Sequence, residues 1–101
     1  MHAFSAAERD FLGSQRIARL ATVSPRGWPH VMPVMFELHD DGSFEFDADG
    51  AKLRNLEAEP RAALVVDAGG PKRGVAVQGR TRVVGADRVR LDPERHFSWG
   101  L

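Results

Sequence analysis

The chain has 101 residues, 43% hydrophobic and 28% charged, a composition typical of one globular domain over residues 1–101. It contains no cysteine, which excludes disulfides and thiolate metal sites and favours a cytoplasmic location. No apolar run approaches about 18 residues and residues 1–16 lack a signal-peptide core, so we expect neither a membrane span nor a secretion signal.

The formal net charge is zero, yet acids and bases are separated along the chain. Residues 37–59 hold eight acidic side chains against Lys52 and Arg54, and residues 72–95 hold seven basic side chains against three acids. The basic stretch has two interpretations. It indicates either an anionic ligand or partner, or a strand with a solvated arginine face.

The first part of the chain predicts a short helix and then a β-hairpin. Ser5–Gly13 has the pattern of a capping box, with Glu8 three residues after Ser5 and a glycine as a stop. The segments RIARLATVS (16–24) and WPHVMPVMFEL (28–38) have β character, and the residues SPRG between them suit a turn. Pro33 cannot donate to a ladder, so it predicts an edge, a bulge or a gap in the second strand.

The rest of the chain predicts four more strands and a second helix. SFEFD places Phe44 and Phe46 inward, and Asp49–Arg61 reads as a helix with Asp49 as its cap. RAALVVDA (61–68) is apolar on both faces, which predicts a strand covered on both sides. VAVQGRTRVV (75–84) alternates, and RVRLDPERHFSWGL (88–101) reads as one or two strands. The sum is a mainly β fold with about six antiparallel strands and two short helices, which favours a barrel.

The second helix has an unusual distribution of charge. Lys52 and Arg54 stand in or just past its first turn, where the helix dipole makes cations unfavourable by roughly 0.3–1 kcal/mol each. Glu57 and Glu59 stand at the opposite end. Either hydration of the two side chains offsets this small cost, or an anion binds in front of the first turn.

Several common site motifs are absent from the sequence. There is neither a G-x-G-x-x-G pattern nor a Walker-type G-K-[ST], and nothing resembles a nucleophile elbow. The four histidines fall at no ligand spacing, so we expect no metal site. An enzyme with this sequence would depend on a cofactor for its chemistry, and we assign no catalytic side chain.

Three motifs together resemble the pyridoxamine 5′-phosphate oxidase-like superfamily of flavin-binding split β-barrels. They are A-T-V-S-x-x-G-x-P-x-x-x-P-V (21–34), A-K-x-R-N-L (51–56) followed by P-R-x-A-L-V-V-D, and V-x-G-R (77–80). The closing HFSWGL behind RLDPER resembles an actinobacterial branch of reductases that use the deazaflavin coenzyme F-420. The resemblance covers nearly the whole chain. It implies a six-stranded antiparallel split β-barrel.

The resemblance also implies a homodimer with two cofactors in clefts between the subunits, coenzyme F-420 or alternatively FMN. Lys52 would bind the cofactor phosphate, and Trp99 would reach a site in the partner subunit. The residues expected at the cofactor are Val34, Met35, Phe36, Phe46, Asp47, Lys52, Arg54, Asn55 and Trp99. The arginines expected near the acidic tail of coenzyme F-420 are Arg80, Arg82 and Arg88.

The implied activity is hydride transfer between this cofactor and a small conjugated or heteroaromatic substrate, whose identity the sequence leaves open. One alternative is a non-catalytic protein that holds a flavin, deazaflavin or tetrapyrrole. Only Gly85-Ala86-Asp87 separates Val84 from Arg88 where relatives carry a longer stretch, and this shortening favours the alternative. A nucleic-acid-binding barrel that uses the arginine face would leave Lys52 unexplained, so we expect no nucleic-acid partner.

Overall fold

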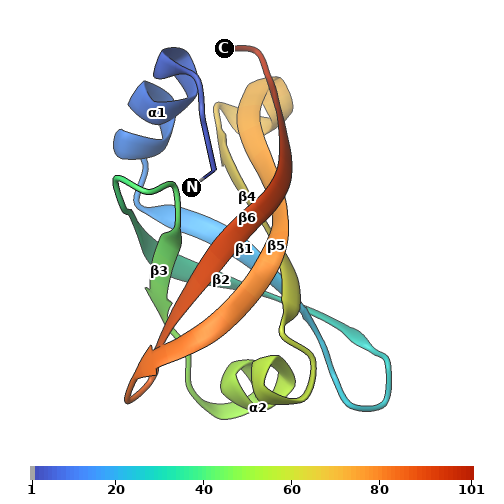
Figure 1. Ribbon diagram of the computed structural model, residues 1–101. Helices are drawn as coiled ribbons and strands as arrows, with labels where there is room; N and C mark the ends of the chain where they lie inside the picture. The colour runs from blue at the N-terminus through green and yellow to red at the C-terminus, as the bar shows by residue number, and fades with distance from the viewer. Residues whose placement is uncertain (1) are drawn as a thin grey trace.

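The computed structural model describes residues 2–101, which form a closed six-stranded antiparallel barrel with the neighbour order β1-β2-β3-β6-β5-β4 (Figure 1). The helix α1 lies near one end of the barrel and α2 lies at the other. The mainly β fold class and the six strands expected from the sequence are therefore confirmed. The elements are α1 Ala6–Gly13, β1 Ile17–Val23, β2 Pro29–Leu38, β3 Phe44–Asp47, α2 Gly50–Ala58, β4 Arg61–Ala68, a 3-10 turn η1 Gly70–Lys72, β5 Arg73–Gly85 and β6 Arg88–Trp99.

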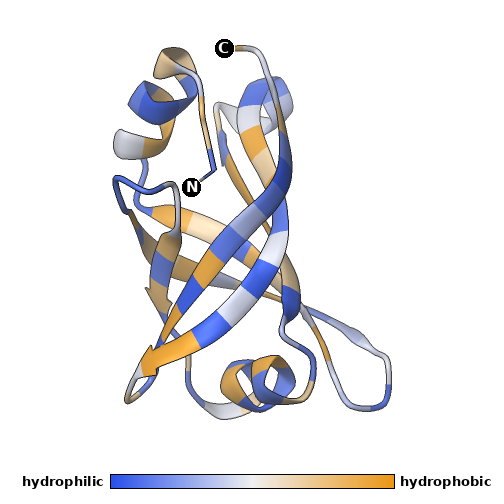
Figure 2. Ribbon diagram, viewed as in Figure 1, coloured by the Kyte–Doolittle hydropathy of each residue, from blue (hydrophilic) through white to orange (hydrophobic). Residues whose placement is uncertain are grey.

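The barrel interior is filled by the inward side chains of all six strands. Phe44 and Phe46 are completely buried, as their alternation predicted, and Figure 2 shows hydrophobic and hydrophilic residues alternating along β5 and β6. The predicted cover over both faces of β4 is present on one face only within residues 2–101. Ala63 and Val65 on its outer face remain partly exposed, because within residues 2–101 no element packs over that face.

The strand β2 has a free edge along its first half. It pairs with β1 from Pro29 to Met35, but its pairing with β3 covers only Phe36 to Leu38. Ser24 N–H donates to Trp28 O and Phe36 N–H donates to Arg16 O, so the alternation of the ladder turns Pro29 and Pro33 away from β1. The missing N–H of Pro33 therefore costs no hydrogen bond to β1, and the edge predicted at this residue is confirmed.

A long hairpin formed by β5 and β6 carries a bulge and a tight turn. The register shifts between Gln78 and Gly79, where the bulge accommodates Pro93, so the last segment is one strand. Gly79 lies against the neighbouring strand so closely that a Cβ would collide with the Asp92 carbonyl. Only Ala86 and Asp87 join the two strands, and Asp87 has φ 59°.

The acidic and basic stretches of the sequence meet in space. In the register of β3 and β6, Glu45 faces Arg90 and Asp47 faces Arg88, and both arginines bond the carboxylates of β3. Along the β5–β6 hairpin, the remaining pairs are Arg80 with Glu94 and Arg82 with Asp92. Arg88 and Arg90 of the basic stretch are thus paired with carboxylates of the acidic stretch.

Among residues 2–101, no helix combines the length and apolar character needed to cross a membrane.

Candidate functional site

The start of α2 follows β3 after two residues and has no side-chain cap. Ala48 N–H donates to Asp87 O at 2.8 Å, which ties this corner to the β5–β6 turn. The prediction that Asp49 caps the helix is wrong, because its side chain makes no cap hydrogen bond. The next residue, Gly50, has φ 55°, a left-handed conformation that departs from the helical geometry of an ordinary first turn. In α1, by contrast, the Ser5–Glu8 capping box is complete.

Two cations stand beside this uncapped helix start. Within residues 2–101, neither Lys52 nor Arg54 has a carboxylate within 4.0 Å. Glu59, just past the other end of α2, bonds Arg61 at 2.6 Å. Free N–H groups, the positive end of the helix dipole and two unpaired cations form a surface suited to an anion.

Asn55 holds α2 on the barrel. Its side chain is buried, and its amide Nδ2 donates to Thr22 Oγ1 on β1 at 3.0 Å. Thr22 is also buried, so the pair is shielded from water. The structure thus places the Asn55 amide inside, where it positions the helix that carries Lys52.

The apolar residues expected at the cofactor divide into inward and outward side chains. Val34, Phe36 and Phe46 are buried and point into the core. Met35 is 69% exposed on the outer face. Together with Phe36 and Asp47 it lines a hollow of about 250 Å³, whose other residues are Arg16, Glu37, Glu45 and Arg88.

The polar wall of this hollow is organised by Glu45, which sequence reasoning did not select. Glu45 accepts from Arg90 Nε at 3.0 Å, Arg88 Nε at 2.8 Å and His39 Nε2 at 3.0 Å. Hydrogen bonds from Arg90 and Arg88 lower the pKa of Glu45 to about 2. The sequence signal for this cluster was the excess of acids in residues 37–59 and of bases in residues 72–95. It identifies Glu45 only when the pairing of β3 with β6 is known.

Trp99 is the last residue of β6, and this end of the strand lies far from α2, so a single chain does not bring Trp99 to Lys52 (Figure 1). Its indole N–H donates to Pro71 O at 2.9 Å, and its ring covers Gly74, where a Cβ would come within 2.7 Å of it. The Phe97 ring lies beside it, with 5.8 Å between centroids.

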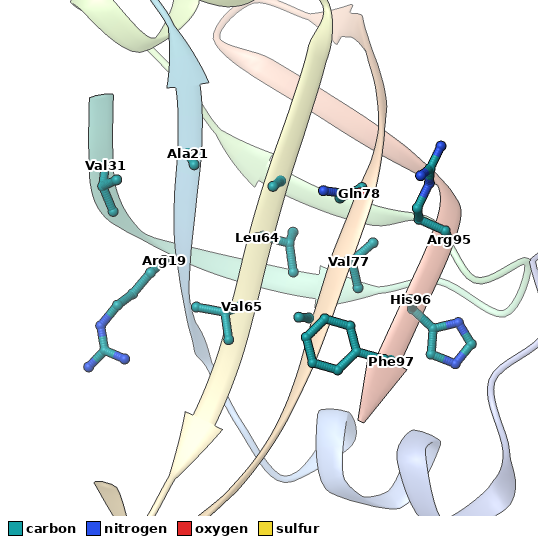
Figure 3. A pocket seen from close by; sticks show the side chains of 12 residues that line it. Arg19, Ala21, Val31, Leu64, Val65, Val77, Gln78, Arg95, His96 and Phe97 are labelled. Carbon is teal, nitrogen blue, oxygen red and sulfur yellow. The ribbon is translucent and has the colours of Figure 1, made fainter. Parts of the chain in front are cut away.

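A second hollow runs over the outer faces of β1, β4, β5 and β6. Figure 3 shows Val31, Val65 and Phe97 around this groove of about 440 Å³, and the first and last are 60% and 66% exposed. Arg19 and Arg95 also line it. Its mainly apolar surface includes the outer face of β4 that the sequence predicted to be covered.

Residues 4–99 match the pyridoxamine 5′-phosphate oxidase family. The chain belongs to this family. A relative from Streptomyces rimosus, a 5a,11a-dehydrotetracycline/5a,11a-dehydrooxytetracycline reductase, is 31% identical over 119 positions, which cover 97% of this chain and 84% of that protein. A pyridoxine/pyridoxamine 5′-phosphate oxidase of Azorhizobium caulinodans is 39% identical over 75 residues, covering 72% of this chain and 35% of that oxidase.

Solved structures share the fold of this family member. A conserved hypothetical protein of Mycobacterium tuberculosis superposes with a TM-score of 0.80 at 25% identity, covering 96% of this chain and 85% of that one. An FAD-binding protein of Mesorhizobium loti gives a TM-score of 0.78 at 22% identity, covering 94% and 91% of the two chains. The split-barrel family expected from the three sequence motifs is therefore confirmed.

Proposed function

We propose that this protein is an oxidoreductase that binds a deazaflavin, coenzyme F-420, or alternatively FMN, and acts on a small conjugated or heteroaromatic substrate. Membership of the oxidase family supports flavin-type binding, and two relatives carry the names of a reductase and an oxidase. The observation that carries the proposal is the start of α2, where an uncapped first turn meets the unpaired Lys52 and Arg54.

The residues present fit the phosphate end of such a cofactor. Lys52 and Arg54 supply charge-assisted donors, and the free N–H groups of the first turn supply further ones. A phosphate here also offsets the unfavourable interaction between these cations and the helix dipole. One bound anion would therefore explain both the missing side-chain cap of α2 and the cations near its first turn.

The ring system fits the free edge of β2 and the adjoining hollow. Val34 and Met35 are the last residues of the stretch of β2 that is not paired with β3, Phe36 begins that pairing, and Asp47 also lines the hollow. The bound flavin or deazaflavin would supply hydride chemistry. The chain itself would orient the ring and substrate and exclude water, so no acid–base side chain is assigned.

The test is equilibrium titration of the protein with coenzyme F-420 and, separately, with FMN. Lys52→Ala should weaken binding of the cofactor by at least about tenfold, the loss of one charge-assisted contact. Lys72→Ala is the matched control, because Lys72 is the chain's other lysine and lies on η1. Failure of wild-type protein to bind either cofactor would overturn the proposal.

We further propose a homodimer in which the apolar groove is covered by a second copy. An exposed patch centred on Phe97 and Val31 marks an interaction site, and the partner would then bring Trp99 toward the site that a single chain leaves without it. Phe97→Asp should shift the mass measured by light scattering from dimer to monomer. A wild-type monomer at micromolar concentration would contradict this part.

A second candidate is a protein of the same fold that holds the cofactor without turnover. The short, two-residue connection between β5 and β6 favours it. Incubating the reduced, protein-bound cofactor with candidate substrates separates the two. Reoxidation that depends on substrate supports the enzyme, and its absence across the panel supports the binding protein.

A further inference from the structure

The two ends of the chain are joined by a polar cluster at the end of the barrel near α1. Its centre is Glu8, a buried carboxylate on α1. Ser98 Oγ donates to Glu8 Oε2 at 2.6 Å, and His96 Nε2 lies 3.0 Å from Glu8 Oε1. Ser5 N–H donates to the same oxygen at 2.8 Å.

The cluster extends to the start of the chain through the second nitrogen of His96. Because Glu8 accepts the Nε2 proton of His96, the Nδ1 of a neutral His96 is an acceptor, and His2 Nε2 lies 2.6 Å from it. Phe4 packs on the same imidazole, with 4.6 Å between ring centroids. Burial opposes the charge of Glu8, but the hydrogen bonds from Ser98, Ser5 and His96 outweigh it and hold its pKa at about 2. The carboxylate is therefore a fixed anion.

The last residues of β6 alternate between this cluster and the outer surface. His96 and Ser98 pair with the buried Val77 and Val75, so all four belong to the inner face. Phe97 and Trp99 stand on the outer face, where Phe97 lines the groove. Whatever fixes His96 and Ser98 on one face also fixes the backbone that presents Phe97 and Trp99 on the other.

We propose that Glu8 is a positioning residue, whose carboxylate holds His96 and Ser98 and thereby sets the placement of Phe97 and Trp99 at the dimer and cofactor surface. That Phe97 and Trp99 contact a partner subunit and a cofactor rests on the proposed function. That Glu8 fixes His96 and Ser98 of β6 does not depend on the proposed function, because the hydrogen bonds described above support it directly. No neighbouring acid provides a second anchor within the cluster, since Glu8 is its one carboxylate among residues 2–101.

The experiment measures the fluorescence of Trp99. The chain has two tryptophans, so a Trp28→Phe background leaves Trp99 as the sole indole emitter. In that background Glu8→Ala should red-shift the Trp99 emission and raise its quenching by acrylamide, while far-UV circular dichroism stays that of the folded barrel. Self-association should weaken by about tenfold, because Glu8→Ala removes the hydrogen bonds from Ser98, His96 and Ser5 and loosens the end of β6 that carries Phe97. Asp10→Ala on the exposed face of the same helix is the control and should change neither reading.

An unchanged Trp99 emission and quenching in folded Glu8→Ala would overturn the proposal. If Glu8→Ala does not fold, Glu8→Gln fills the same volume and should give a smaller change in the same direction; no change there would overturn it as well. The two proposals fail separately. Wild-type protein without cofactor binding overturns the proposed function, whereas the response of Trp99 to Glu8 is measured with no cofactor present.

Discussion

The hydrogen bond between Asn55 and Thr22 allows a quantitative test of how α2 is fixed to the barrel. Both side chains are buried, and the Nδ2 to Oγ1 distance is 3.0 Å. Thr22→Val leaves the Asn55 amide without a partner, which should lower the free energy of unfolding by about 1–3 kcal/mol. Asn55→Leu leaves the Thr22 hydroxyl unpaired and should cost about 1–2 kcal/mol. The double variant removes both polar groups and should cost much less than the sum.

The assay is urea unfolding followed by circular dichroism for the wild type, the two single variants and the double variant. The expected coupling free energy is about 1–2 kcal/mol, because each single substitution strands a buried polar group and the double substitution strands none. Costs that simply add would refute the reasoning. They would mean that water reaches the pair or that each side chain finds another partner.

Three further predictions concern stability. The free energy of unfolding should fall as pH decreases from about 4.5 to 2, because Glu8 has a pKa of about 2 in the fold against 4.5 ordinarily. The ionisation of Glu8 contributes about 3 kcal/mol to this free energy, and Glu8→Gln should flatten this part of an acid-unfolding curve. Gly79→Ala should cost about 1–3 kcal/mol in urea unfolding because its Cβ meets the Asp92 carbonyl, whereas Gly13→Ala, with open space around it, should be nearly neutral. Glu45→Gln should lower the thermal midpoint at low salt, and high salt should shrink the difference from wild type.

Local sequence patterns predicted most of the barrel. The capping box at Ser5 and Glu8 and the turn at residues 24–27 depend on neighbours in the chain, and both appear in the structure as expected. Alternation correctly buried Phe44 and Phe46, because a strand with one face in a core imposes a period of two. The outer face of β4 was misjudged because an apolar strand face indicates that something covers it without indicating whether the cover belongs to the same chain.

The candidate site was predictable only in part, for a related reason. The unfavourable positions of Lys52 and Arg54 are visible from helix geometry alone, but the missing cap at Asp49 depends on the left-handed conformation of Gly50. The roles of Glu45 and Arg88 depend on contacts between strands far apart in sequence. The same holds for Glu8, which meets its partners 88 and 90 residues away.

The prolines along the free edge of β2 also bear on aggregation. An exposed edge with regularly spaced N–H and C=O groups is a template to which a further strand can add. Between Pro29 and Pro33, the residues facing that edge are the two prolines and Val31, so Val31 has the one N–H group available there to an incoming strand. The carbonyls remain open to small donors. This edge can therefore accept hydrogen bonds from a ligand while denying a growing β-sheet the donors it needs.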